Sequence, residues 1–94
     1  MSEWKPPAYP LISPYLICRE PERVIEFMIA VFDASLARRF DRQDGSLMHA
    51  ETRIDDSIVM IGGGAAEYLS SEVHVQVYVA DAQAVYDRTI ASGG

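Results

Sequence analysis

The chain has 94 residues, of which 49% are hydrophobic and 23% charged, so we expect one small globular domain. Its net charge of −6 excludes nucleic acid as a main partner, because a phosphate backbone is bound by clustered basic side chains. No apolar run approaches the roughly 20 residues that a membrane-spanning helix needs, and no signal peptide is recognised. The single cysteine, Cys18, lies in an apolar run, which predicts an inert, buried thiol. One cysteine cannot form an internal disulfide, so a cytoplasmic protein is expected. Without a membrane-spanning run, no membrane partner is expected.

The N-terminal part of the chain is predicted to form an arm and a strand. Residues 1–10 are rich in proline, so we expect an extended arm that Trp4 and Tyr9 could pin to the body or to another subunit. Residues 11–18 are apolar and partly β-prone. Because Pro14 cannot donate to a sheet ladder, it favours an edge position or a bulge for this strand.

A helix is predicted over residues 20–34. Pro21 suits the first helical turn, where its missing N–H is not needed. Glu20 and Glu22 lie where the helix dipole favours negative charge. The apolar side chains recur at helical spacing in a wide stripe, which predicts a well-buried helix. The stripe comprises Val24, Ile25, Phe27, Met28, Ile29, Val31 and Phe32.

Three further strands are predicted over residues 35–42, 46–54 and 57–62, with turns at Asp44-Gly45 and Asp55-Asp56. The glycines that follow the last of these strands lack the Lys-Ser/Thr pair of a phosphate-binding loop, so a flexible linker is expected. In the middle strand, alternation places one set of side chains on a common face. This set is Leu47, His49, Glu51 and Arg53.

The stretch VHVQVYVAD, residues 73–81, alternates between valines and His74, Gln76 and Tyr78. This pattern predicts a strand whose valine face packs under a helix and whose other face carries polar binding groups. Asp81 is expected to cap a second helix that ends at Gly93-Gly94. Helical spacing places Ala82, Val85, Tyr86 and Thr89 on one face of this helix.

Two strand-plus-helix units therefore begin 61 residues apart, at Ser13 and His74. Glu20 aligns with Asp81 at this offset, and both stand at a helix start. The first unit continues with three strands, whereas the second is a strand and a helix only. A sheet without these strands has an open edge, so we expect pairing with another copy, aggregation, or trimming from a longer protein.

Three segments, ISPYLICREPERVIEFMIAVFDA, LMHAETRIDDSIVMIGGG and VHVQVYVADAQAVYDRTIASGG, resemble the glyoxalase/bleomycin-resistance/dioxygenase superfamily, also called vicinal oxygen chelate. The resemblance points to its PhnB-like branch and covers residues 11–94. It implies an α+β fold in which βαβββ modules form a cupped mixed sheet with helices on the outer face. The predicted domain then consists of a first module over about 11–62 and a partial, apparently truncated second module over about 72–94.

The resemblance also implies where a divalent metal would bind. Metal-using members carry a His at the start of the first strand of each module and a Glu on its last strand. His74 stands at the second His position, but Ser13 replaces the first His, and Val59 and Met60 lie near the first Glu position. At the positions that the resemblance assigns to metal ligands, His74 is therefore the one candidate in this sequence. No cofactor is specified, and a divalent metal is left open.

His49 and Glu51 offer an alternative, because they share a strand face two residues apart. They could act as metal ligands, or as a base with an orienting group, in the same cup. Equally, Glu51 could pair with Arg38 or Arg53 on the sheet surface.

Three hypotheses of function follow. The first is a small-molecule-binding protein whose cup is completed by a homodimer or higher homo-oligomer. The second is a metal-dependent lyase, isomerase or dioxygenase, and the third is a truncated self-assembling module without catalysis. Ligand-binding candidates are Tyr15, His49, Glu51, His74, Gln76 and Tyr78.

Overall fold

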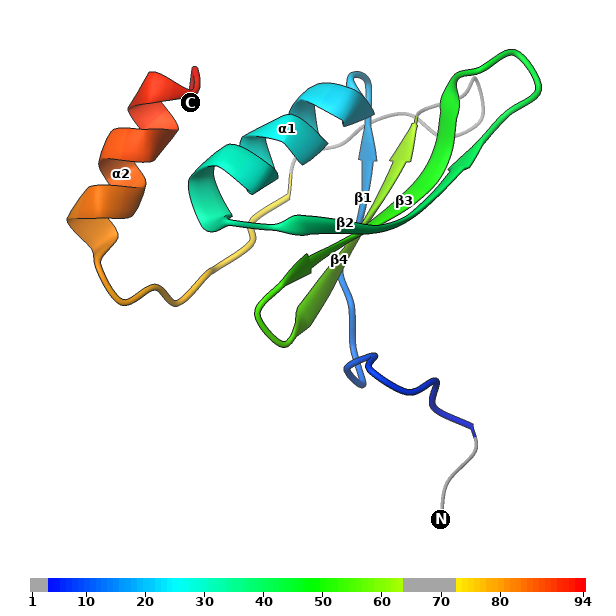
Figure 1. The fold of residues 1–94 in the computed structure, drawn as a ribbon, viewed down its shortest axis with the longest axis horizontal. Helices are drawn as coiled ribbons and strands as arrows, with labels where there is room; N and C mark the ends of the chain where they lie inside the picture. The colour runs from blue at the N-terminus through cyan, green and yellow to red at the C-terminus, as the bar shows by residue number, and fades with distance from the viewer. Residues whose placement is uncertain (1–3, 64–72) are drawn as a thin grey trace.

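The computed structural model describes residues 4–63 and 73–94, and Figure 1 shows how their elements are arranged. The described chain contains four strands and two helices, which confirms the predicted α+β fold with one βαβββ-type module. In chain order the elements are β1 (Tyr15–Cys18), α1 (Pro21–Phe32), β2 (Ser35–Asp41), β3 (Leu47–Ile54), β4 (Ser57–Gly63) and α2 (Ala82–Ala91).

The four strands form one mixed sheet in the order β1-β4-β3-β2. β1 runs parallel to β4, and the other two pairings are antiparallel. The edge position predicted from Pro14 is confirmed for β1, and the Pro14 carbonyl still accepts a 2.8 Å hydrogen bond from the Met60 N–H. The missing N–H of proline therefore does not interrupt the ladder, because the edge strand uses its carbonyl side here.

Helix α1 covers one face of this sheet (Figure 1). Ile25, Met28 and Val31 are buried at helical spacing and bring the apolar stripe onto the sheet. Ile29 is 44% exposed, so the predicted stripe is wider than the face that α1 buries. The core between helix and sheet consists of Ile25, Met28, Ala34, Leu47, Ala50, Val59 and Ile61.

Alternation along the strands separates this core from a second, open face of the sheet. In β3, Thr52 points toward α1, because its hydroxyl lies 3.9 Å from the Met28 sulfur and donates a 3.0 Å hydrogen bond to the Val59 carbonyl. The odd-numbered neighbours His49 and Glu51 therefore lie on the face opposite α1. Leu47 was predicted to share their face but is buried in the core, at the point where the β2–β3 register shifts between Phe40 and Asp41. This face carries the polar site described below.

The predicted strand over 73–79 is wrong, since these residues form an irregular segment (Figure 1). A strand requires a hydrogen-bonded neighbour, and none of the described strands pairs with this segment. The predicted burial of its valine face is wrong for the same reason. Val73 is 54% exposed, Val75 is 48% exposed and Val79 is 38% exposed.

Helix α2 begins where the sequence predicts, because the Asp81 carboxylate accepts a 3.0 Å hydrogen bond from the Ala84 N–H. Gly93 adopts a left-handed φ of 88° just beyond the helix, as expected for a C-terminal glycine. Among the described elements α2 contacts only α1, and the Arg88 Nε donates a 3.0 Å hydrogen bond to the Val31 carbonyl. None of its residues is buried.

Candidate functional site on the open face of the sheet

The sheet register aligns side chains from all four strands on the face opposite α1. Cross-strand pairs form one row, which consists of Tyr15, Met60, Glu51 and Arg38. A second row of cross-strand pairs lies two residues away from the first on each strand. It consists of Ile17, Gly62, His49 and Phe40. The open face thus brings together groups that lie up to 47 residues apart in the chain.

A chain of hydrogen bonds links four polar side chains on this face. The Tyr15 hydroxyl lies 2.9 Å from His49 Nδ1, and His49 Nε2 lies 2.9 Å from Glu51 Oε2. The Tyr9 hydroxyl, from the N-terminal arm, donates to Glu51 Oε1. Because an ionised carboxylate only accepts, His49 must donate from Nε2, and in neutral His49 Nδ1 then accepts from Tyr15.

The network keeps Glu51 ionised although its side chain is only 8% exposed. Burial by itself raises the pKa of this carboxyl group, but the hydrogen bonds from Tyr9 and His49 and the positive charge of Arg38 outweigh it and lower the pKa. The same contact raises the pKa of Tyr9, chiefly through its hydrogen bond to Glu51. At neutral pH the pair therefore consists of a carboxylate acceptor and a protonated phenol donor.

Aromatic rings flank the network on both sides. The Tyr15 ring centroid lies 5.2 Å from that of His49, and the Phe40 centroid lies 6.2 Å from it. The Arg38 guanidinium stands 5.5 Å from the Phe40 centroid. Gly62 leaves room for this arrangement, since a Cβ there would lie 2.9 Å from the Tyr15 ring.

The structure brings three of the predicted ligand-binding residues together, namely Tyr15, His49 and Glu51. His74, Gln76 and Tyr78 lie in the exposed segment after residue 72 and make no hydrogen bond to that network within the described chain. Gln76 and Tyr78 instead line a groove of about 340 Å³ beside the turn between β3 and β4. Their role in ligand binding stays a prediction.

Sequence reasoning missed part of the site. It named Tyr9 only as an anchor of the arm, and it did not name Phe40 or Gly62. Phe40 reaches His49 because β2 and β3 pair with two register shifts, which no local pattern reveals. Arg38, foreseen as a partner of Glu51, lies opposite it in the register and lowers its pKa.

The side chains of the described residues do not fit a divalent metal. Both ring nitrogens of His49 are engaged, and His74 is exposed outside the network. Val59 lies in the apolar core and Met60 on the open face, and neither offers a hard oxygen ligand. No group of three or more His, Cys, Asp or Glu side chains in the described ranges is placed to hold a metal ion.

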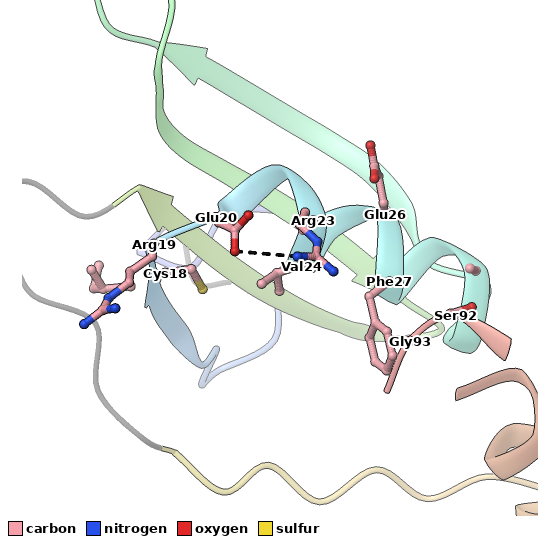
Figure 2. A pocket seen from close by; sticks show the side chains of 11 residues that line it. Cys18, Arg19, Glu20, Arg23, Val24, Glu26, Phe27, Ser92 and Gly93 are labelled. Carbon is pink, nitrogen blue, oxygen red and sulfur yellow. Dashed lines mark ion pairs between the residues drawn. The ribbon is translucent and has the colours of Figure 1, made fainter. Parts of the chain in front are cut away.

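Another hollow lies away from the open face, between β1, α1 and the C-terminal turn (Figure 2). It measures about 730 Å³, and Figure 2 shows Glu20 and Arg23 at its wall, 3.7 Å apart. Both side chains are about 70% exposed to solvent, so this pair binds water as readily as a ligand. Cys18 lines the same hollow and is partly rather than fully buried, and burial raises the pKa of its thiol. Because a raised pKa disfavours the reactive thiolate, the open face is the better candidate.

Comparison with solved structures identifies the fold. The chain is similar to TioX from Micromonospora sp. ML1, with a TM-score of 0.62 and 23% identity over 87% of this chain and 71% of that one. It is also similar to the fosfomycin resistance protein FosX from Mesorhizobium loti, with a TM-score of 0.66 and 24% identity over 89% of this chain and 70% of that one. Both are members of the vicinal oxygen chelate, or glyoxalase/bleomycin-resistance, superfamily. The chain has the fold of that class.

Sequence comparison adds three mycobacterial relatives, and no family model matches. An uncharacterized protein of Mycobacterium bovis and two of Mycobacterium tuberculosis are each 30% identical to this chain over 95 aligned positions. The alignments cover 89% of this chain but 62% of the M. bovis protein and 56% of the M. tuberculosis proteins. The chain therefore spans little more than half the length of these relatives. No helix in the described residues is long and apolar enough to cross a membrane.

Proposed function

We propose that this protein is a cytoplasmic small-molecule-binding protein of the glyoxalase/bleomycin-resistance type, in the PhnB-like branch. Its ligand binds on the open face of the sheet, where Tyr15, His49 and Glu51 supply the polar contacts. The observation that carries the proposal is the hydrogen-bonded chain of these three side chains between aromatic rings. An apolar face with a few convergent polar groups is the usual composition of a ligand site.

Binding without a metal accounts for this arrangement better than metal-dependent catalysis does. The groups that would hold a metal are replaced or already engaged, whereas the aromatic and hydrogen-bonding groups of a binding face are present. The likeness of fold to FosX, a fosfomycin resistance protein, supports a function of this kind.

We also propose that a second copy of the chain completes the site. The C-terminal region leaves Tyr78 91% exposed, Tyr86 60% exposed and Ile90 54% exposed. A C-terminal segment and helix with this much uncovered apolar surface are suited to burial against another copy. Light scattering tests this point, with a dimer or larger species expected and a monomer at all concentrations contradicting it.

Ligand binding is tested by thermal unfolding in the presence of fosfomycin, bleomycin and a panel of small aromatic compounds. A compound at 100 times its Kd adds about 2.7 kcal/mol of stability, which raises the Tm of a domain of this size by roughly 10 °C or more. His49→Ala is expected to weaken binding of such a compound about tenfold or more, because it removes the imidazole and leaves Glu51 Oε2 without its donor. A panel in which no compound stabilises the protein contradicts the proposal.

His74→Ala is the matched control, since it removes the same side chain from an exposed position. Unchanged affinity in this variant confines the ligand to the network around His49. A loss equal to that of His49→Ala shows instead that the C-terminal segment closes over the face, as the alternation of His74, Gln76 and Tyr78 predicts.

A further inference from the structure

We infer that Tyr9 occupies the place of the ligand's own hydroxyl group, so that the site selects a phenol and the N-terminal arm must leave Glu51 before the ligand binds. This inference rests on the proposed binding function and names its ligand class. Two hydrogen bonds join the arm to the open face, from Tyr9 to Glu51 Oε1 and from Arg53 Nη2 to the Ala8 carbonyl at 2.9 Å.

The hydrogen-bonding capacity of Glu51 defines what a ligand must offer. One carboxylate oxygen, Oε2, accepts from His49, and the other, Oε1, accepts from Tyr9 alone among the residues that the structure describes. A ligand that displaces Tyr9 must therefore bring a donor of its own, because an unsatisfied carboxylate at a position 6% exposed is costly.

The surroundings favour a phenol over a cationic donor. Tyr15 and Phe40 provide aromatic surface at the network, and they are 49% and 45% exposed, so a planar ring can reach them. Arg38 stands beside Phe40 and its charge acts on Glu51, so a second cation at this position would be repelled. A neutral aromatic hydroxyl, which Tyr9 itself presents, meets both conditions.

The arm is held in a way that permits release. Besides these two hydrogen bonds, few side chains hold the arm, since Trp4 is 73% exposed. Leu11 and Ile12, which follow the arm, are 72% and 80% exposed. Ala8 adopts a left-handed φ of 67°, a conformation that residues other than glycine rarely adopt. Departure of the arm therefore gives up few contacts and relieves this strain.

The test uses p-cresol, which carries the side-chain phenol of tyrosine, titrated into the isotopically labelled protein and followed by NMR. Tyr9→Phe removes only the competing hydroxyl, so it is expected to bind p-cresol about tenfold or more tightly than the unmodified chain. Arg53→Gln loosens the arm without touching Glu51 and is expected to act in the same direction by a smaller factor. Arg23→Gln makes the same change as Arg53→Gln at an exposed position on α1, away from the open face, and is expected to leave the affinity unchanged. The methyl ether 4-methylanisole, which cannot donate, is expected not to bind.

Each other outcome overturns the inference. Equal affinity of p-cresol for the unmodified chain and for both arm variants means that Tyr9 does not compete for the ligand position. If 4-methylanisole binds as tightly as p-cresol, the site does not recognise the hydroxyl group of the ligand. If p-cresol does not bind while another compound of the panel binds through His49, the ligand class is wrong and the proposed function stands. If nothing in the panel binds, the proposed function fails with it.

Discussion

The two helices of this protein have similar lengths and opposite surroundings. Helix α1 has 12 residues, four of them buried, and it lies across the four-stranded sheet. Helix α2 has 10 residues, none of them buried, and among the described elements it touches only α1. Its N-terminus is the better capped of the two, because Asp81 accepts a backbone hydrogen bond and Glu20 does not. Local capping is therefore sufficient to begin a helix, whereas burial depends on a sheet to pack against.

The same contrast applies to the two alternating segments. In β3 the alternation separates a core face from a polar face, because β2 and β4 pair with it on both sides. In residues 73–79 an even more regular alternation produces no strand and leaves most of its valines exposed. The module from β1 to β4 thus has its own core, whereas no residue of α2 is buried within the described chain.

The largest effect should come from truncating matched isoleucines in the two regions. Ile61 is fully buried in the core beneath α1, and Ile90 is 54% exposed on α2. We expect Ile61→Ala to lower the free energy of unfolding by about 2–5 kcal/mol and Ile90→Ala by less than about 0.5 kcal/mol. Urea denaturation measures both. Equal losses at a protein concentration where light scattering shows a monomer would break the comparison. A larger loss for Ile90→Ala only where the chain associates would agree with the proposed burial of α2 against a second copy.

A smaller effect is expected from Glu51→Gln, and it should depend on pH. The pKa of Glu51 is lowered in the folded state, so its contribution to stability is complete above the unfolded carboxyl pKa of roughly 4.3 and is lost as the pH falls through the lower folded value. At pH 7 the variant should be less stable by about 1–2 kcal/mol, because a charged acceptor is lost.

Urea midpoints of the unmodified chain and of Glu51→Gln, measured from pH 7 down to about pH 3, check this sign. The two curves should converge toward the acid end. A gap that stays constant or widens on acidification would show that Glu51 is not held ionised by Tyr9 and His49. Asp87→Asn on α2, whose carboxylate accepts a hydrogen bond from the exposed Gln83 side chain, is the matched control for the loss of one carboxylate charge.

The smallest effect should be local. Asp81→Ala removes the cap of α2 and should destabilise that helix by about 1 kcal/mol, while the sheet is unaffected because α2 does not contact it. Hydrogen exchange should therefore accelerate at the amides of α2 and remain unchanged in β3. Acceleration in both regions would show that the two unfold as one cooperative unit.

Local signals were sufficient for most of the module. Pro21 and the apolar spacing after it fixed α1 to within two residues at its C-terminal end, and the turns at Asp44-Gly45 and Asp55-Asp56 separated β2, β3 and β4. The parity of β3 was enough to pair His49 with Glu51, since alternation is a property of the strand itself.

The rest of the site depended on register and on contacts between distant segments. Phe40 meets His49 only through the shifted pairing of β2 and β3, and Tyr9 meets Glu51 only because the arm returns to the sheet. Residues 73–79 were predicted as a strand from a pattern that is necessary but not sufficient, because a strand exists only with a paired neighbour.

The sequence by itself therefore determined the elements of the module, the face that carries His49 and Glu51, and the class of fold. The elements and the face follow from side-chain periodicity and capping, which act over a few neighbouring residues. The class of fold followed from the resemblance of three segments to a known superfamily. Only the tertiary structure decided that Tyr15, His49, Glu51 and Tyr9 form one hydrogen-bonded chain and that His74 lies outside it. The physical reason is that hydrogen bonds between strands and from the arm are made across the sheet, where proximity is set by pairing and not by sequence distance.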